Sequence, residues 1–218
     1  MGKRGPKPKK IVDETWSSNL AYAVGLLATD GCLARKYYLI NLTSKDIEQL
    51  NNFCKALCIK LNIGRKFNGQ GMLCHQVQFK NVIFYNFLLS IGLTPAKSKT
   101  LGKLKIPDKY FFDFLRGSFD GDGTTYSYWD PRWKSSFMLY TAFVSASKNH
   151  IEWLRESINR LLKLTGHITK SGNHACYQLK YAKYESLKLL KKIYSGHKPI
   201  YLKRKRLKID RALAIIGR

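Results

Sequence analysis

Acidic residues are scarce in this sequence. Its 218 residues include 39 Lys and Arg but only 14 Asp and Glu, which gives a formal net charge of +25 at pH 7. Such an excess is larger than solubility requires, and it creates a positive field that suits a polyanion such as nucleic acid. The sequence is 44% hydrophobic and 13% aromatic, enough for a packed core, so the charge does not belong to a disordered basic tail.

Long apolar runs and a disulfide framework are also missing. No apolar stretch approaches the roughly 20 residues that span a bilayer, and the basic N-terminus has no apolar segment typical of a signal peptide. We therefore expect an intracellular protein without a membrane partner, in the cytoplasm of a bacterium or in an organelle. Five cysteines form no regular framework, which is typical of a reducing compartment. A zinc site at Cys54, Cys58, Cys74 and His75 is the alternative to simple burial of these side chains, and we favour burial.

Two segments of the chain share one plan. Residues 22–33 read YAVGLLATDGCL and residues 114–125 read FLRGSFDGDGTT. Each has an apolar helical pattern that contains a glycine, Gly25 or Gly117, and that ends in an Asp-Gly pair at Asp30 or Asp122. Taken singly, each pair is only a helix stop followed by a turn. The duplication makes a shared role the better interpretation.

The flanking text repeats in the same order, which indicates two copies of one unit. We align residues 42–57 with 145–162, with one residue inserted so that Ile47 matches Ile151, and then 74–79 with 176–181 and 96–101 with 202–207. The expected organisation is a basic, flexible N-terminal arm over residues 1–12, a first repeat over 13–104 and a second over 105–218, with a linker near 101–110. The arm contains Arg4-Gly5-Pro6, an imperfect match to the core of a minor-groove AT-hook, and a solubilising tail is equally consistent with it.

Each repeat is predicted as an αββαββα unit of the α+β class, with a four-stranded antiparallel sheet and helices on one face. The predicted helices are residues 20–29, a second helix that runs to about 61, and 82–91, with a counterpart of the last at 184–194. Strands are expected over residues 33–43, and around 65 and 79 with a hairpin turn at Asn68-Gly69. Ser171-Gly172-Asn173 is the corresponding turn in the second repeat.

The strand pattern alternates between an apolar and a polar face. Val77 and Phe79, like Leu179 and Tyr181, should face the helices, together with Tyr38, Ile40 and Leu42. Outward Gln, Asn and Arg side chains are suited to hydrogen bonds with base edges in the major groove, although a solvated sheet face is the alternative. The predicted DNA-binding residues are Arg35, Tyr37, Asn41, Thr43, Arg65, Gln76, Gln78, Lys80, Lys170, Gln178 and Lys180.

The two Asp-Gly helix ends are predicted to meet. Small residues spaced three or four apart, including Gly25 and Gly117, allow two helices to approach closely, which would bring Asp30 and Asp122 together. Two close carboxylates repel unless a cation binds, and the carbonyl oxygens of Thr29 and Gly121 are further donors. A small set of hard oxygen ligands favours Mg²⁺ over zinc, and Mn²⁺ or Ca²⁺ can occupy such a site.

These two segments resemble the paired LAGLIDADG motifs of homing endonucleases, in the single-chain form with two repeats. The resemblance covers the chain from about residue 16 onward. It implies that Asp30 and Asp122 are the metal ligands, that the motif helices form a pseudo-two-fold interface, and that the sheets form a saddle over the DNA major groove. It also suggests catalytic roles for Lys97 and Lys203, with Lys99 or Arg204 as alternatives in a shifted register, and for Ser44 and Ser147, which precede the second helix of each repeat.

The function implied by the resemblance is that of an intron-encoded meganuclease. Such a monomeric enzyme would make a double-strand break in a long, asymmetric DNA site by Mg²⁺-dependent phosphodiester hydrolysis. Strands of about ten residues span roughly 33 Å, so two sheets would cover about twenty base pairs. The alternatives are an intron RNA maturase and a catalytically inactive DNA-binding regulator with the same fold.

Overall fold

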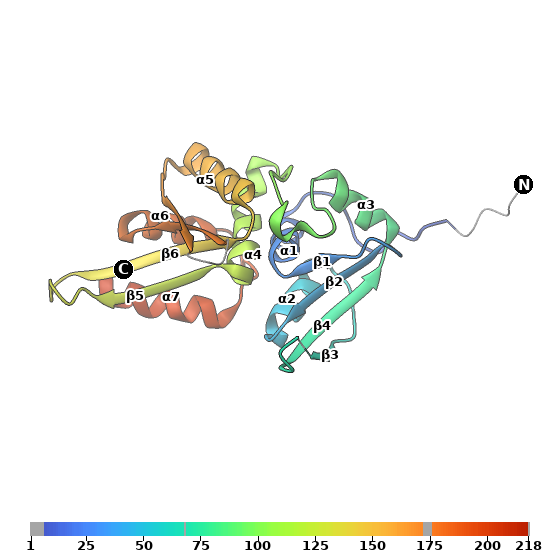
Figure 1. Cartoon of the computed structure of the whole chain (residues 1–218), viewed down its shortest axis with the longest axis horizontal. Helices are drawn as coiled ribbons and strands as arrows, with labels where there is room; N and C mark the ends of the chain where they lie inside the picture. The colour runs from blue at the N-terminus through green and yellow to red at the C-terminus, as the bar shows by residue number, and fades with distance from the viewer. Residues whose placement is uncertain (1–6, 68, 172–175, 218) are drawn as a thin grey trace, which may run out of the picture.

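The computed structural model shows two similar units that lie side by side (Figure 1). It describes residues 7–67, 69–171 and 176–217. The first unit consists of α1 (Ser18–Thr29), β1 (Gly31–Leu33), β2 (Leu39–Ser44), α2 (Ile47–Ala56), β3 (Gly64–Phe67), β4 (Leu73–Lys80) and α3 (Val82–Ser90). The second consists of α4 (Phe111–Asp122), β5 (Thr124–Trp129), β6 (Phe137–Ser145), α5 (Lys148–Leu162), β7 (His167–Ser171), β8 (Cys176–Tyr181) and α6 (Lys183–Ile193). The predicted αββαββα order is confirmed in both repeats.

A further helix, α7 (Lys203–Ile216), follows the second unit and was not predicted. The first unit has only a three-residue 3-10 turn, Lys97–Lys99, at the corresponding place. A second such turn, Asp108–Tyr110, leads into α4. The two repeats therefore end differently, although their helix–strand cores match.

The two sheets are antiparallel and have equivalent strand orders, β1-β2-β4-β3 and β5-β6-β8-β7. In the first sheet Ile40 lies opposite Phe79 and Leu42 opposite Val77, and all four side chains are buried on the helix side. Leu179 and Tyr181 are buried in the same way in the second sheet. The predicted alternation of apolar and polar faces is confirmed for these strands.

The first hairpin departs from the prediction at its tip. Tyr37 and Tyr38 have φ angles of 66° and 50°, so they form a turn and not strand, and Arg35 precedes them in the same loop. Tyr38 is 49% exposed, with its ring edge against Tyr85, so it does not face the core as expected. A left-handed backbone at two consecutive residues ends the strand, and β2 begins only at Leu39.

The alignment of the second helices was wrong by three residues. Strands β2 and β6 end at Ser44 and Ser145, and the following helices are capped by Asp46 and Ser147. Ile47, predicted to match the buried Ile151, is 47% exposed. An amphipathic helix repeats its apolar stripe every three or four residues, so a shift of three preserves the pattern in sequence. The equivalent pairs are Leu50 with Ile151, Phe53 with Leu154, Leu57 with Ile158, and Gln49 with His150.

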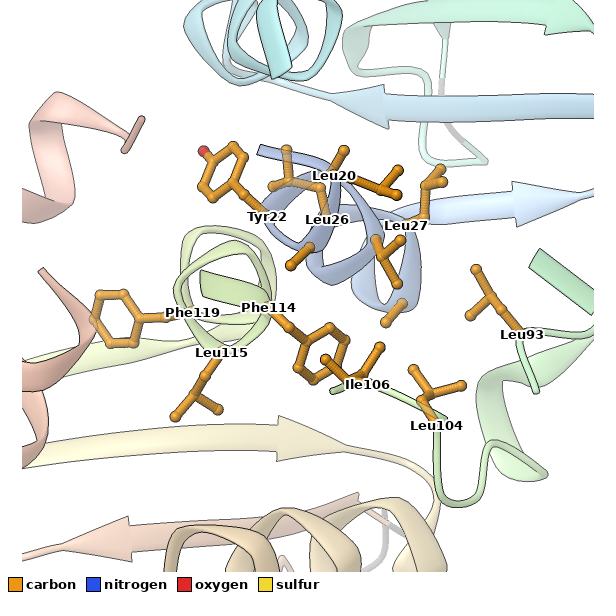
Figure 2. Close-up of a cluster of buried hydrophobic side chains, with 14 of the residues drawn as sticks. Leu20, Tyr22, Leu26, Leu27, Leu93, Leu104, Ile106, Phe114, Leu115 and Phe119 are labelled. Atoms are coloured by element: carbon orange, nitrogen blue, oxygen red, sulfur yellow. The ribbon is translucent and has the colours of Figure 1, made fainter. Parts of the chain in front are cut away.

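Helices α1 and α4 pack against each other at the centre of the molecule and form most of the contact between the two units (Figure 1). A Cβ atom added to Gly25 would lie 2.2 Å from the backbone oxygen of Phe114, and one added to Gly117 would lie 2.0 Å from that of Tyr22. The two backbones are therefore too close for any other residue at these positions. Figure 2 shows the apolar side chains around this crossing, among them Leu26 and Leu27 of α1 and Phe114 and Phe119 of α4.

The N-terminal segment is attached to the first unit from Lys9 onward. The Asn81 side chain donates a hydrogen bond to the Lys9 carbonyl at 2.9 Å, and Val12 is only 1% exposed. The chain is therefore held at the Lys9 carbonyl and at Val12, within the span predicted as a flexible arm, although the side chains of residues 9–11 are exposed. Arg4-Gly5-Pro6 and the predicted turn residues Asn68 and 172–173 lie outside the described residues. Within the described part of the chain, none of the helices is long and apolar enough to cross a membrane.

Candidate active site

The ends of α1 and α4 bring the two acidic residues of the motifs together. Asp30 caps α1, and Asp122 is the last residue of α4. A Cβ atom added to Gly121 would lie 2.0 Å from the Thr29 hydroxyl and 3.1 Å from Oδ2 of Asp30, so the Asp30 carboxylate lies against the backbone beside Asp122. We call Asp30, Asp122, Lys97 and Lys205 the acid–lysine cluster.

Both carboxyl groups of the cluster have raised pKa values. Burial raises the pKa of Asp30 to about 6, and the negative charge of Asp122 contributes to this shift. The pKa of Asp122 is raised because surrounding protein displaces part of its hydration, although its side chain reaches solvent. Lys97 and Lys205 act in the opposite direction on both groups. Keeping both carboxyl groups ionised at this place therefore costs free energy, and a bound divalent cation would reduce that cost.

Each helix end binds a lysine ammonium group through its backbone. Lys97 Nζ donates to the carbonyl oxygens of Thr29 at 3.3 Å and Gly31 at 2.6 Å. Lys205 Nζ donates to those of Phe119, Gly121 and Gly123 at 2.6 to 2.8 Å. Unpaired carbonyls and the helix dipole make a helix C-terminus a favourable place for a cation. Desolvation lowers the pKa of both lysines, that of Lys205 to about 8.

Lys205, and not the predicted Lys203, is the counterpart of Lys97. Lys203 lies exposed at the start of α7, where its backbone N–H donates to Glu48. Two residues further along the helix, and so on its opposite side, Lys205 is directed back to the end of α4. The alternatives also point elsewhere: Arg204 pairs with Asp46, and Lys99 is exposed. The short turn at Lys97 is replaced by a helix in the second repeat. The sequence alignment of the two repeats therefore matched Lys97 with Lys203 and not with Lys205.

Replacing these two α7 lysines should therefore have different effects. If the chain cleaves DNA, Lys205→Met should slow cleavage by about 100-fold, because a fixed positive charge beside the reacting phosphate is removed. Lys203→Met, its matched control, should cleave within about threefold of the unchanged protein. Single-turnover cleavage rates of the two variants provide the test, and equal rates would contradict the placement of Lys205.

Asp30 is also bound by a glutamine that the sequence did not single out. Gln49 Nε2 donates to Oδ2 of Asp30 at 2.5 Å, and the Ser44 hydroxyl donates to Gln49 Oε1 at 2.8 Å. Ser44 therefore acts on Asp30 through Gln49, which it orients, and not by direct contact. Gln49 is 2% exposed, which is unusual for an amide at a helix start and indicates that it is held for this contact.

The second repeat places His150 where the first has Gln49. A cavity of about 20 Å³, close to the size of one water molecule, is lined by His150, Asp122, Ser118 and Ser145, among others. The hydroxyl of Ser118 is buried without a hydrogen-bond partner in the structure. Ser147, predicted as a catalytic residue, instead caps α5 and donates to the Leu101 carbonyl at 2.5 Å. The two halves of the site therefore differ.

His150 should make stability depend on pH. Burial lowers its pKa to about 4 from an ordinary 6.5, and its Nδ1 lies 3.0 Å from the Gly102 carbonyl. Below pH 6.5 the unfolded chain binds a proton at His150, whereas the folded chain binds it only near pH 4. The free energy of unfolding should therefore decrease as the pH is lowered from 6.5 to 4, by on the order of 3 kcal/mol. In His150→Gln, which copies the first repeat, this part of the loss should disappear. Urea unfolding of both proteins from pH 7.5 to 4 measures the difference, and parallel curves would show that His150 titrates normally.

Asp120, the other acid of the second motif, is fully buried and does not face the site. Its Oδ2 accepts hydrogen bonds of 2.8 Å from the Tyr22 hydroxyl and from the backbone N–H of Leu202. Leu202 directly precedes α7, so Asp120 fixes the start of the helix that carries Lys205. Burial raises the pKa of Asp120 to about 6. The first motif has Ala28 at the equivalent position.

The face of the first sheet that points away from the helices carries several of the predicted DNA-binding residues. The Asn41 amide donates to Gln76 Oε1 at 3.0 Å, and the Thr43 hydroxyl donates to Asn41 Oδ1 at 2.9 Å. Gln78 lies opposite Asn41 on the same face, and Lys80 Nζ lies 5.2 Å from the Tyr37 ring centre. In the second sheet Gln178 and Lys180 lie opposite Val144 and Ala142. The polar face thus forms a hydrogen-bonded amide network in the first unit.

Two predicted DNA-binding residues lie on the opposite face. Arg65 pairs with His75, and Lys170 pairs with Tyr177, so both share the side of the sheet that faces the helices. Lys66 and Thr169 take the outward positions beside them. Both strands lie at a sheet edge; β3 is exposed throughout, and in β7 Ile168 alone packs against the core, so the sequence offers little apolar alternation to fix their register.

This fold occurs in solved structures of low sequence identity. The homing endonuclease I-WcaI bound to its DNA recognition sequence superposes with a TM-score of 0.59 at 16% identity, covering 95% of each chain. I-DmoI in complex with DNA and Mn gives 0.53 at 17% identity, covering 83% of this chain and 98% of that chain. The N-terminal LAGLIDADG domain of DUF199/WhiA gives 0.55 at 15% identity, covering 91% and 89%. No protein-family model and no curated protein sequence matches the chain.

The chain therefore has the two-repeat LAGLIDADG fold that its motifs predict. At these identities the likeness establishes the architecture alone, and the assignment of an activity depends on the residues at the ends of α1 and α4.

Proposed function

We propose that this chain is a site-specific DNA endonuclease that cleaves both strands of its target with divalent metal ions. The observation that carries the proposal is the acid–lysine cluster, in which Asp30 and Asp122 lie together at the C-terminal ends of the two helices. Paired carboxylates with raised pKa values, beside two partly desolvated lysines, are typical of a catalytic centre and costly as a purely structural feature.

The residues present are suited to Mg²⁺ or a similar ion. Asp30 and Asp122 supply carboxylate oxygens, and among the described residues they are not part of any group of three or more His, Cys, Asp or Glu side chains that could hold a metal. The carbonyls of Thr29 and Gly121, predicted as ligands, accept hydrogen bonds from Lys97 and Lys205. Two carboxylates leave most of the coordination to water and phosphate oxygens, as Mg²⁺ prefers. A bound ion would supply Lewis-acid stabilisation of the phosphate and a more acidic water.

The side chains of the acid–lysine cluster have different roles in such a reaction. At pH 7 to 8 Asp30 is ionised, because its pKa is near 6, and Gln49 fixes its orientation. Lys97 and Lys205 place positive charge where the phosphate becomes more negative in the transition state. The cavity beside His150 and Asp122 has the size of a single water, and solvent there would lie next to the carboxylate.

DNA would bind along the faces of the two sheets that point away from the helices. The net charge of +25 supplies the long-range attraction, and Asn41, Gln76, Gln78 and Lys80 can contact base edges and phosphates. Strand β6 has nine residues and spans about 30 Å, so two such sheets correspond to roughly twenty base pairs. The protein would act as a monomer, since its two repeats already supply both halves of the site.

Selection from randomised duplexes tests this proposal. Linear DNA that carries a long random segment is incubated with the protein and Mg²⁺, and cleaved ends are captured and sequenced. We expect one long, asymmetric sequence to be enriched, with no cleavage in EDTA. Enrichment of bound but never cleaved duplexes in Mg²⁺, Mn²⁺ and Ca²⁺ would contradict a nuclease.

A DNA-binding protein without cleavage activity is the second candidate. The same fold is found in the N-terminal LAGLIDADG domain of DUF199/WhiA as well as in homing endonucleases, and a fold by itself does not imply cleavage. Both motif acids are nevertheless present here, where their negative charge would weaken the attraction for DNA phosphates. We therefore place the nuclease first, and the selection above distinguishes the two functions.

A further inference from the structure

A row of tyrosines lies on one face of the second sheet. Strand pairing places Tyr126 opposite Tyr140 and Tyr128 opposite Met138. The rings of Tyr126 and Tyr140 stack with centroids 5.1 Å apart and planes at 22°, and Tyr128 lies 6.2 Å from Tyr140 at 19°. Lys180 Nζ lies 5.8 Å from the ring centres of both Tyr126 and Tyr140. We call Tyr126, Tyr128 and Tyr140 the tyrosine ladder.

The tyrosine ladder lies on the face that points away from the helices. Phe137 and Leu139, which alternate with Met138 and Tyr140 along β6, pack against Ala212 of α7 on the other side. Tyr140 therefore shares its face with Gln178 and Lys180, which is the face proposed to meet DNA. The β5–β6 ribbon extends away from the α1–α4 crossing (Figure 1), and β5 begins two residues after Asp122, so the ladder starts near the acid–lysine cluster and continues outward along a half-site.

The equivalent face of the first sheet has a different chemistry. Strand β1 has only three residues, against six in β5, and the face is dominated by the hydrogen-bonded Asn41, Thr43 and Gln76. Amide side chains of this kind can pair with the N6 and N7 atoms of adenine. The ladder instead presents aromatic carbon and phenol groups, stiffened by stacking and by the lysine over the rings.

Aromatic carbon has one apolar target among the base edges of the major groove, the 5-methyl group of thymine. We propose that the tyrosine ladder selects thymines in the half of the DNA site bound by the second sheet, through contact with these methyl groups. The first sheet reads its own half mainly by hydrogen bonds. This inference rests on the proposed function, because it requires that the outward sheet faces bind a specific duplex.

The test removes methyl groups from the DNA. Once a site has been selected, deoxyuridine replaces thymidine in one half-site at a time, and the dissociation constant is measured with Ca²⁺ in place of Mg²⁺. The half-site bound by the first sheet is identified independently, as the half whose base preferences relax in Gln76→Ala. Tyr140→Ser removes the central ring of the ladder, and Tyr140→Phe keeps the ring as the matched control. Thermal melting tests whether both variants are folded.

We expect uracil to weaken binding by about fourfold for each contacted methyl in the second half-site, and by less than twofold in the first. Tyr140→Phe should keep this penalty, whereas Tyr140→Ser should lose most of it. Equal penalties in the two halves, or a full penalty in Tyr140→Ser, would overturn the inference. If no duplex sequence is bound preferentially, the proposed function itself fails and the inference with it, so the two failures are distinguishable. If Tyr140→Ser does not fold, Tyr126→Ser takes its place with the same criteria.

Discussion

Asp30→Asn and Asp122→Asn should each lower DNA cleavage by at least a thousandfold while leaving DNA binding intact. Each change removes one of the two carboxylates available to a divalent ion, and stabilisation of the phosphate by that ion accounts for several kcal/mol of the barrier. Both variants should fold, and their unfolding temperatures should equal or exceed that of the unchanged protein, because burial of a charged carboxylate and its repulsion by Asp122, which raise the pKa of Asp30, are relieved.

Single-turnover cleavage of the selected site in Mg²⁺, together with equilibrium binding in Ca²⁺, measures both parts of this prediction. Asp210→Asn is the matched control, since Asp210 is a half-exposed acid paired with Arg206 on α7, away from the cluster. Loss of cleavage in all three variants would indicate a general effect of charge. Cleavage at the unchanged rate by either motif variant would remove that aspartate from the mechanism.

Gly117→Ala should destabilise the folded protein far more than the addition of one methyl group would suggest. The added methyl would lie 2.0 Å from the Tyr22 carbonyl oxygen and 3.1 Å from the Cα atom of Gly25, where only backbone could give way. Separating α1 from α4 would open the buried core around Leu26, Phe114 and Phe119 (Figure 2). We expect a loss of about 3 kcal/mol or more in the free energy of unfolding, and cleavage should fall as the carboxylates move apart.

Gly102→Ala is the control for the glycine prediction. A Cβ atom at Gly102 would meet nothing within 4 Å, so this variant should stay within about 0.5 kcal/mol of the unchanged protein. Urea denaturation of the three proteins provides the comparison. A Gly117→Ala protein as stable as Gly102→Ala would show that the two helices are not packed as closely as described.

The parts of the fold that depend on repeated local patterns could be predicted from the sequence. Duplicated Asp-Gly helix ends, glycines inside apolar helices and alternating strands identified both units and the apolar side of each sheet. The exact correspondence between the units could not be predicted in the same way. A helical stripe looks the same after a shift of three residues, and this shift concealed the equivalence of Gln49 and His150.

Other features of the site depend on tertiary structure. Lys205 reaches the cluster only because α7 replaces a short turn, and Asp120 holds the start of that helix by a contact with the backbone of Leu202. Stacking of the tyrosine ladder depends on the register of β5 and β6, which no turn signal specified. The ends of β2 at Ser44 and of β6 at Ser145, which only the structure reveals, are what align His150 with Gln49.

The central claim is that Asp30 and Asp122 together hold divalent ions between the helix ends and DNA. Its most direct test is to count Mn²⁺ ions bound to the complex of the protein with an uncleavable duplex of its selected site, by electron paramagnetic resonance. We predict tightly bound Mn²⁺ that decreases in Asp30→Asn and in Asp122→Asn and is absent from the double variant. The same amount of bound Mn²⁺ in the double variant as in the unchanged protein would contradict the claim.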